Sequence, residues 1–464
     1  MSGEIRMSEK RRQEKTGHFG KKALRLGVVC LALAGLTACD TVGDMFSSDG
    51  SSDVKLKGER LSVMELGDKL EVDPLSADEQ IVLPKPYDNK DWPQPGGAPD
   101  NAMYHLAAPG KLDKVWSADA GEGTSSEGEL VASPIVADGR VYVLDTEATV
   151  RAFSLSGDRD WKTELVPEGE DAEEGRGGGI AFNDGKVFVT TGFGEVHALN
   201  AATGKNVWTK KLREPFRAAP TVNGGRVFAI TSDNQLIALD EKTGAVLWRH
   251  RGIAESAGIV SSTSPAVAGS IVVVPYSSGE LFAIRVQNGT PVWSDSLTRT
   301  GNLTSLSSLN DIAGRPVIDR DRVFAVSHSG RMVSIDLRTG ERVWTKDISS
   351  VQTPWVAGDW VFIVTSDQQV AALSRRDGKT RWITSLPRFE DPEDRTEPIS
   401  WSGPVLAGDR LVLVSTGGEA VSLSPYSGKI EGRIELDSGS AIAPVFANGT
   451  MYILTDDAEL TAYK

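Results

Sequence analysis

Residues 220–248 read PTVNGGRVFAITSDNQLIALDEKTGAVLW, and this stretch contains the unit from which the fold follows. Two apolar runs, 227–230 and 236–239, are separated and flanked by turn-forming residues such as Asn223-Gly224 and Thr243-Gly244. Val, Ile and Phe suit a pleated, half-buried surface, and such turn pairs join antiparallel strands in tight hairpins. The stretch therefore predicts four short strands joined by hairpins.

The same frame recurs from about residue 112 to the end of the chain. A prolyl or apolar residue is followed after 24 positions by a glycine, and four positions later by a tryptophan. The units that keep this spacing are Pro220-Gly244-Trp248, Pro265-Gly289-Trp293, Pro316-Gly340-Trp344, Pro354-Gly378-Trp382 and Ile180-Gly204-Trp208. Pro134-Gly157-Trp161 is one residue shorter, and Pro404-Gly428 has Gly432 at the tryptophan position. Repeats of roughly 40–50 residues with strand patterning are typical of propeller blades.

The two ends of this repeat region complete each other. The last unit begins at Pro444 and stops at Lys464, before any fourth strand, whereas residues 112–116 resemble a fourth strand without a blade. Joining them would close a ring and remove exposed sheet edges. The chain is therefore expected to be all-β, an eight-bladed propeller over residues 112–464 with its N-terminal strand in the last blade. An open solenoid is the rival, but it needs no complementary half-units.

The repeated tryptophans admit two interpretations. They could be stacking platforms for a ligand, or they could pack neighbouring blades against each other. One large aromatic residue per blade at a fixed position favours packing, because each buries a large area and suits the gap between two blades. The residues concerned are Trp161, Trp208, Trp248, Trp293, Trp344 and Trp382.

The N-terminus has the pattern of an export signal. Basic residues precede the apolar run 26–38, and residues 36–39 read Leu-Thr-Ala-Cys, which resembles the lipobox of lipoprotein precursors. We expect a signal peptide over 1–38, lipidation of Cys39, a flexible tether over 39–53 and an extended arm over 54–111 that packs on the outside of the main domain. A plain secretory signal with an incidental cysteine is the alternative. Asp40 leaves open which membrane would hold the anchor.

Charge and cysteine content exclude several classes of function. Residues 1–38 hold eight Lys or Arg and three Asp or Glu, so their removal changes the net charge from −14 to −19. Such a body should repel nucleic acid. The cysteines are Cys30 and Cys39, both in the export signal, so the mature body has no disulfide or cysteine nucleophile. The histidines lie in different units without metal-ligand spacing, and we expect neither a metal nor a cofactor.

The Gly-xxx-Trp unit resembles the repeat of quinoprotein dehydrogenases, which bind pyrroloquinoline quinone in an eight-bladed ring. The resemblance implies the fold, but the adjacent cysteine pair of those enzymes is missing, so catalysis is not expected. The glycine-rich stretch 175–179 is interpreted as a blade-entry loop, and the acidic runs 168–174 and 390–397 as solvated loops.

Two linkers between blades are longer than a minimal propeller requires, namely residues 249–264 and 294–315. They carry apolar residues that the repeat does not need. These residues either tuck into the ring or form a docking patch with an apolar centre. The candidate partner-binding residues are Ile259, Val260, Leu309, Asn310, Asp311 and Ile312.

A secreted lipoprotein with this repeat and no cofactor residues resembles the BamB family, which assists insertion of β-barrel proteins into the outer membrane. The resemblance implies a monomeric, non-catalytic scaffold, lipid-anchored on the periplasmic side of the outer membrane. It also implies docking of these linkers on the POTRA domains of BamA within the barrel assembly complex. A family acidic contact falls on Asp311, whereas Ala313 and Val260 replace a family aspartate and arginine. A general periplasmic propeller that binds another envelope protein, a peptide or a polysaccharide is the alternative.

Overall fold

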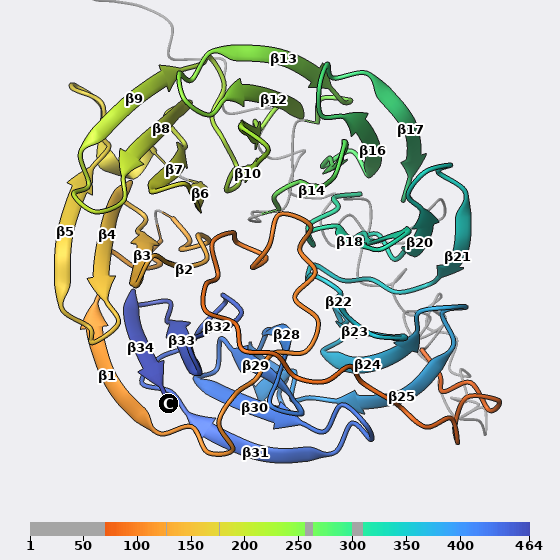
Figure 1. Ribbon diagram of the computed structural model, residues 1–464. Helices are drawn as coiled ribbons and strands as arrows, with labels where there is room; N and C mark the ends of the chain where they lie inside the picture. Colours follow the sequence, from red (N-terminus) through yellow and green to blue (C-terminus); the bar gives the residue numbers. More distant parts are fainter. Residues whose placement is uncertain (1–69, 127, 176, 256–262, 299–309) are drawn as a thin grey trace, which may run out of the picture. The chain divides into compact units, whose positions relative to one another are not determined.

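Each repeat of the sequence forms one four-stranded antiparallel sheet. The computed structural model describes residues 70–126, 128–175, 177–255, 263–298 and 310–464. Within these residues, eight such sheets form the blades of a ring, with the first strand of each blade near the centre and the fourth at the rim (Figure 1). The predicted eight-bladed propeller is therefore confirmed. We number the blades 1 to 8 from β2 onward.

The strand bounds follow the repeat closely. Blades 1 to 4 consist of β2 (Ile135–Ala137), β3 (Arg140–Leu144), β4 (Thr149–Ser154), β5 (Arg159–Glu164), β6 (Gly178–Asn183), β7 (Lys186–Thr191), β8 (Glu195–Asn200), β9 (Asn206–Lys211), β10 (Thr221–Asn223), β11 (Arg226–Ile230), β12 (Gln235–Asp240), β13 (Val246–Arg251), β14 (Ala266–Ala268), β15 (Ile271–Pro275), β16 (Glu280–Arg285) and β17 (Pro291–Ser296). Blades 5 to 8 consist of β18 (Val317–Asp319), β19 (Arg322–Val326), β20 (Met332–Asp336), β21 (Arg342–Lys346), β22 (Trp355–Ala357), β23 (Trp360–Val364), β24 (Gln369–Ser374), β25 (Thr380–Ser385), β28 (Trp401–Ala407), β29 (Arg410–Ser415), β30 (Glu419–Leu423), β31 (Ile430–Glu435), β32 (Val445–Ala447), β33 (Thr450–Leu454), β34 (Glu459–Tyr463) and β1 (Lys114–Asp119).

The first hairpin of each blade uses the turn residues that the sequence suggested. Asp138 and Gly139 have φ values of 51° and 72°, and Asn448 and Gly449 have values of 54° and 66°. Two successive positive φ angles are the requirement of the tight hairpin turn that matches the twist of the flanking strands. The second and third strands are almost entirely buried, because both of their faces are covered by neighbouring blades.

The repeated tryptophans pack and hydrogen-bond each blade against the next one, as predicted. In blade 5, the Trp344 indole Nε1 donates to the carbonyl of Arg375 in blade 6 at 2.9 Å. A Cβ built on Gly378 would lie 2.9 Å from the Trp344 ring, so the repeated glycine leaves room for the indole of the preceding blade. The same donation to the next blade is made by Trp116, Trp161, Trp208, Trp248, Trp293 and Trp382. The glycine and the tryptophan of one unit therefore act at opposite interfaces of the blade. The glycine makes room for the indole of the preceding blade, and the tryptophan donates to the next blade.

The two chain segments of blade 8 close the ring. Strand β1 pairs antiparallel with β34, and Asp113 and Lys464 exchange two backbone hydrogen bonds of 3.1 and 2.9 Å. The other blades have a hairpin between their third and fourth strands, whereas blade 8 has two chain segments there. A tryptophan at position 432 of blade 7 would contact this hairpin of the next blade, but blade 8 has no hairpin there. This explains why the tryptophan is replaced at this one position.

The prediction that the N-terminal arm packs on the outside of the main domain is confirmed for its first described residues and wrong for the rest. The N–H of Asp73 donates to the carbonyl of Thr380, and the carbonyl of Glu79 accepts from Arg381, so this part lies along β25, the rim strand of blade 6. Residues 89–106 instead pass around the centre of the ring (Figure 1). Moving along the arm, the chain meets the innermost strand of blade 8, then of blades 1 to 7 in order. The contacts are Asn89 with Asn448, Trp92 with Val136, Pro93 with Phe182, Gln94 with Val222, Pro99 with Val267, Asp100 with Ile318, Tyr104 with Trp355, and Leu106 with Leu406 and Gly408. The arm therefore contacts all eight blades and connects them to one another.

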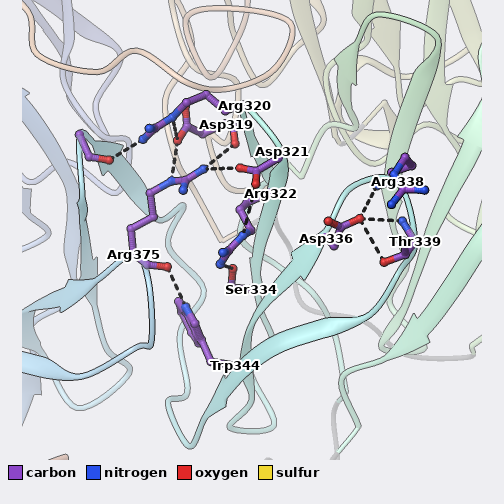
Figure 2. A network of polar contacts seen from close by, with 11 residues as sticks. Asp319, Arg320, Asp321, Arg322, Ser334, Asp336, Arg338, Thr339, Trp344 and Arg375 are labelled. Carbon is purple, nitrogen blue, oxygen red and sulfur yellow. Dashed lines mark hydrogen bonds and ion pairs between the residues drawn. The ribbon is translucent and has the colours of Figure 1, made fainter.

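A buried ionic network joins blades 5 and 6 beside the arm (Figure 2). Asp319 is fully buried and accepts a hydrogen bond of 2.9 Å from Nε of Arg375, whose side chain is 10 % exposed. Arg375 Nη2 also donates to the backbone carbonyl of Asp319 and to Oδ1 of Asp321, and this pairing lowers the pKa of Asp321. Burial and the nearby Asp319 raise the pKa of Tyr104 in the arm to about 12.

Within the described residues, no helix has the length and apolar character needed to cross a membrane. Cys30 and Cys39 lie outside these residues, as do the proposed tether and the first part of the arm. The lipidation of Cys39 stays a prediction.

Candidate partner-binding face

The ring has two faces that differ in what covers them. Hairpins between the first and second strands lie on one face, which we call the arm face because residues 89–106 contact the neighbouring ends of the first strands. The opposite face, the linker face, carries the connections from each blade to the next and the turns between second and third strands. The described ends of the two long linkers, residues 252–255, 263–265, 297–298 and 310–316, lie at this linker face.

Three of the six predicted partner-binding residues can be located. Ile259, Val260 and Leu309 lie outside the described residues. Asn310 is half-buried at the turn of blade 4, with its carbonyl oxygen 2.9 Å from the position of a Cβ on Gly279. Ile312 is fully buried in the core between blades 4 and 5, so its side chain tucks into the ring. Docking by this set of residues stays a prediction.

Asp311 is buried in an ion pair that the sequence did not suggest. Its side chain is 1 % exposed, and both carboxylate oxygens lie 3.4 Å from Nη1 of Arg217. Arg217 comes from the linker between blades 2 and 3, and its Nη2 also donates to the carbonyl of Pro275 in blade 4. The pair thus fixes one linker to another across blades. Asp311 is placed to position the linker, since its carboxylate does not lie on the surface.

Ile253 is an exposed apolar residue that the sequence analysis did not single out. It follows the last strand of blade 3, and 59 % of the residue is exposed. Its backbone N–H donates to Glu280 at 2.7 Å, and its carbonyl accepts from Asn234 at 2.7 Å. These bonds hold its backbone in place although its side chain is solvated. The sequence signal was available, because Ile253 is apolar at a position that the repeat leaves to a linker.

The acidic run 390–397 is a hairpin rather than a loop. Strands β26 (Phe389–Asp391) and β27 (Thr396–Pro398) pair antiparallel in the linker between blades 6 and 7. Most of its residues are exposed, so the expected solvation is confirmed while the expected irregular structure is wrong. The other acidic run, 168–174, ends in a short 3-10 turn, Ala172–Glu174.

A cavity of about 430 Å³ lies at the centre of the ring. One end is formed by residues 92–101 of the arm, including Trp92, which stacks on Trp355 with ring centroids 6.3 Å apart. The rest of the lining comes from the linker side of blades 1, 5, 6, 7 and 8. Its exposed lining residues include Ser400 and Ala441, which both belong to linkers. The arm therefore forms a floor, and the cavity opens toward the linker face.

The cavity lining carries charges of both signs. Arg315 lines it and donates to the Ser133 hydroxyl of blade 1 at 3.2 Å, and burial lowers the pKa of Arg315 to about 10. Glu129 and Asp456 line it as well, and burial raises the pKa of Asp456. In the described part of the chain, no group of three or more His, Cys, Asp or Glu side chains is arranged to hold a metal ion.

Comparison with known proteins adds a consistent set of relatives. The family model described as "Outer membrane protein assembly factor BamB" matches residues 156–384 and 390–464. The protein of that name from Xanthomonas campestris is 32 % identical over 76 % of this chain and 86 % of its own length. Its counterpart from Salmonella typhimurium is 30 % identical over 75 % of this chain and 88 % of its own length.

Solved structures agree on the fold. The crystal structure of BamB from Moraxella catarrhalis has a TM-score of 0.62 at 20 % identity and covers 76 % of this chain and all of the other. A europium-containing methanol dehydrogenase has a TM-score of 0.63 at 15 % identity and covers 78 % of this chain and 89 % of its own. A BamB protein and a methanol dehydrogenase thus share this ring, so function has to be inferred from more than the fold.

Proposed function

The chain belongs to the BamB family of outer membrane protein assembly factors, and from this premise we propose that it is a non-catalytic scaffold of the β-barrel assembly machinery. In this proposal its linker face docks on the POTRA domains of BamA. The docked ring assists the folding and insertion of outer membrane proteins. Lipidated Cys39 holds it on the periplasmic side of the outer membrane.

The observation that carries the docking proposal is the division of the ring into two faces. The arm occupies the centre of one face, whereas the linker face presents the long linkers of blades 3 to 5. There the exposed Ile253 has a hydrogen-bonded backbone, and Asp311 is held in place by its ion pair with Arg217. An apolar side chain on a rigid backbone loses little entropy on binding. We propose that Ile253 joins Ile259, Val260, Leu309 and Asn310 in contacting the partner, and that Asp311 and Ile312 support them.

Replacing Ile253 by aspartate is expected to reduce co-purification of BamA with the tagged chain by about tenfold, because a charge would be placed in the apolar centre of the interface. The measurement is quantitative pull-down from solubilised membranes, with folding checked by thermal melting. The matched control is Val207→Asp, which places the same charge on an exposed valine of a rim strand. Equal BamA recovery with both variants and the parent chain would reject Ile253 as a contact.

Charge reversal at Asp311 tests a different role. Because Asp311 is buried against Arg217, Asp311→Lys should disturb the linker and lower stability along with docking. The exchange of both charges, Asp311→Arg with Arg217→Asp, is the informative companion variant. Partial recovery of docking in the exchanged pair supports a positioning role for Asp311, and complete absence of recovery supports a direct contact.

The anchor is tested by separating the inner and outer membranes of cells that make the full chain. Recovery with the outer membrane, lost on Cys39→Ser, is the expected result. Recovery with the inner membrane would contradict the proposed location, because Asp40 would then act as a retention signal. Membrane attachment that survives Cys39→Ser would contradict lipidation itself.

A further inference from the structure

The innermost strand of each blade has one edge that faces the centre of the ring. In the described sheets, β2, β6, β10, β14, β18, β22, β28 and β32 each pair with one strand only, so their other edge is available for a further chain. The arm uses this edge. Trp92 forms an antiparallel bridge with Val136, and Leu106 forms a parallel bridge with Ala407. Even the side-chain amide of Gln94 bonds both the N–H and the carbonyl of Val222, as a peptide group would.

The arm covers only part of this ring of edges. It contacts the middle of the short first strands and the hairpins that follow them, such as Ile318 and Asn448. The cavity lies against the opposite ends and the linkers that lead into them. Its lining includes Ser133, Thr353 and residues 443–444 from the linkers that lead into blades 1, 6 and 8, and residues 402–405 from the longer first strand of blade 7. In blade 7 the first strand, β28, thus extends from Leu406, which binds the arm, into the open cavity.

The polar groups of the cavity suit a peptide better than a charged small molecule. A chain of polar groups connects two linkers through β28: the Gln352 amide donates to the Ser402 hydroxyl at 3.3 Å, and this hydroxyl donates to the carbonyl of Ala441 at 2.7 Å. An anion that approached Arg315 would also meet Glu129 and Asp456, and a cation would meet Arg315. A neutral ligand avoids both costs, because an unpaired charge in a partly buried site is unfavourable.

Size and floor define the ligand further. The volume of about 430 Å³ lies within the usual range of ligand pockets, about 300–1,000 Å³. The floor contains the buried, stacked pair Trp92 and Trp355. The half-buried lining residues Val131, Val351 and Ala443 provide apolar surface for an aromatic side chain. Main-chain hydrogen bonds to a strand edge give affinity for an extended chain, and pockets for its side chains give selectivity.

We propose that the central cavity is a binding site for an extended, uncharged polypeptide segment that carries an aromatic residue. The segment enters from the linker face and lies along β28 and the linkers that lead into blades 6, 8 and 1, above the floor formed by the arm. The chain's own arm already binds the neighbouring first strands as such a segment would. This site is separate from Ile253 and does not depend on docking to BamA.

The test uses the purified chain, from residue 40 onward, and a fluorescein-labelled short peptide that alternates threonine and phenylalanine. Fluorescence anisotropy is expected to show saturable binding. Ala441→Trp should weaken it by about tenfold or more, because the indole would fill the mouth of the cavity while the backbone bonds of Ala441 are kept. Ala202→Trp is the matched control, since Ala202 is exposed and lies outside the cavity.

A second peptide with aspartate at every phenylalanine position should bind at least about tenfold more weakly, because its side chains can neither pack on the apolar lining nor avoid Glu129 and Asp456. Equal binding of the first peptide to the parent chain, Ala441→Trp and Ala202→Trp would overturn the proposal, as would the absence of saturable binding to the parent chain. Ala441→Trp should leave BamA recovery unchanged, and Ile253→Asp should leave peptide binding unchanged. Failure of one proposal is therefore distinguishable from failure of the other.

Discussion

Replacing Asp319 by alanine is expected to lower the free energy of unfolding by about 3–5 kcal/mol, the usual cost of removing one partner of a buried ion pair. The reason is the guanidinium of Arg375, which stays buried between blades 5 and 6 while it loses its fully buried counter-ion (Figure 2). Denaturation by urea, followed by tryptophan fluorescence, measures the loss, since Trp344 donates to the backbone of Arg375 in the same interface.

The matched control is Asp321→Ala in the same network. Asp321 also accepts from Arg375, at 3.0 Å, but its side chain is 66 % exposed. Exposed pairs contribute about 1 kcal/mol or less. Removing both buried charges, by Asp319→Leu with Arg375→Met, should recover part of the stability because no uncompensated charge is then left. Equal losses of unfolding free energy for Asp319→Ala and Asp321→Ala would show that the burial of Asp319 does not determine how much this network stabilises the protein.

Replacing Trp92 by alanine is expected to cost a similar amount, about 3–5 kcal/mol, because a large buried aromatic side chain leaves a cavity when it is truncated. Trp92 is 3 % exposed, stacks on Trp355 and joins the arm to blade 1. Its loss would remove the floor of the central cavity and the side-chain anchor of the arm. Thermal and urea denaturation measure the effect, and limited proteolysis followed by mass spectrometry should show cleavage within residues 89–106.

Leu75→Ala is the control for Trp92→Ala. Leu75 belongs to the same arm but is 83 % exposed, so its truncation should change stability by about 0.5 kcal/mol or less. A stable Trp92→Ala variant with an uncut arm would mean that the arm is held by its backbone bonds alone. In that case the indole would contribute little to the ring.

The blades could be predicted from the sequence because each is specified locally and repeatedly. Turn pairs such as Asp138-Gly139 and the spacing of glycine and tryptophan are short-range signals, and eight copies reinforce one another. The half-units at the two ends of the repeat region also predicted how the ring closes. Gly432 appeared only as an exception, and its reason became visible with the structure of blade 8.

The path of the arm could not be predicted in the same way. Most of its contacts use backbone atoms, as between Pro93 and Phe182, and therefore leave no pattern of side chains in the sequence. The ion pair of Asp311 is hidden for a related reason. Its partner Arg217 lies 94 positions away in another linker, and neither residue belongs to the repeat. Location of the long linkers was predictable, but not which of their side chains reach solvent.

The closure of blade 8 has a consequence for the order in which the molecule can assemble. A chain is synthesised from its N-terminus, so the arm and β1 are made before any blade is complete, whereas their partners include β34, which is made last of the strands. Contacts between residues so distant along the chain form slowly, and unpaired strand edges invite aggregation in the meantime. The arm and β1 are thus made before the blades, but they find their last partners only after β34 has been made. Until then they need protection from aggregation.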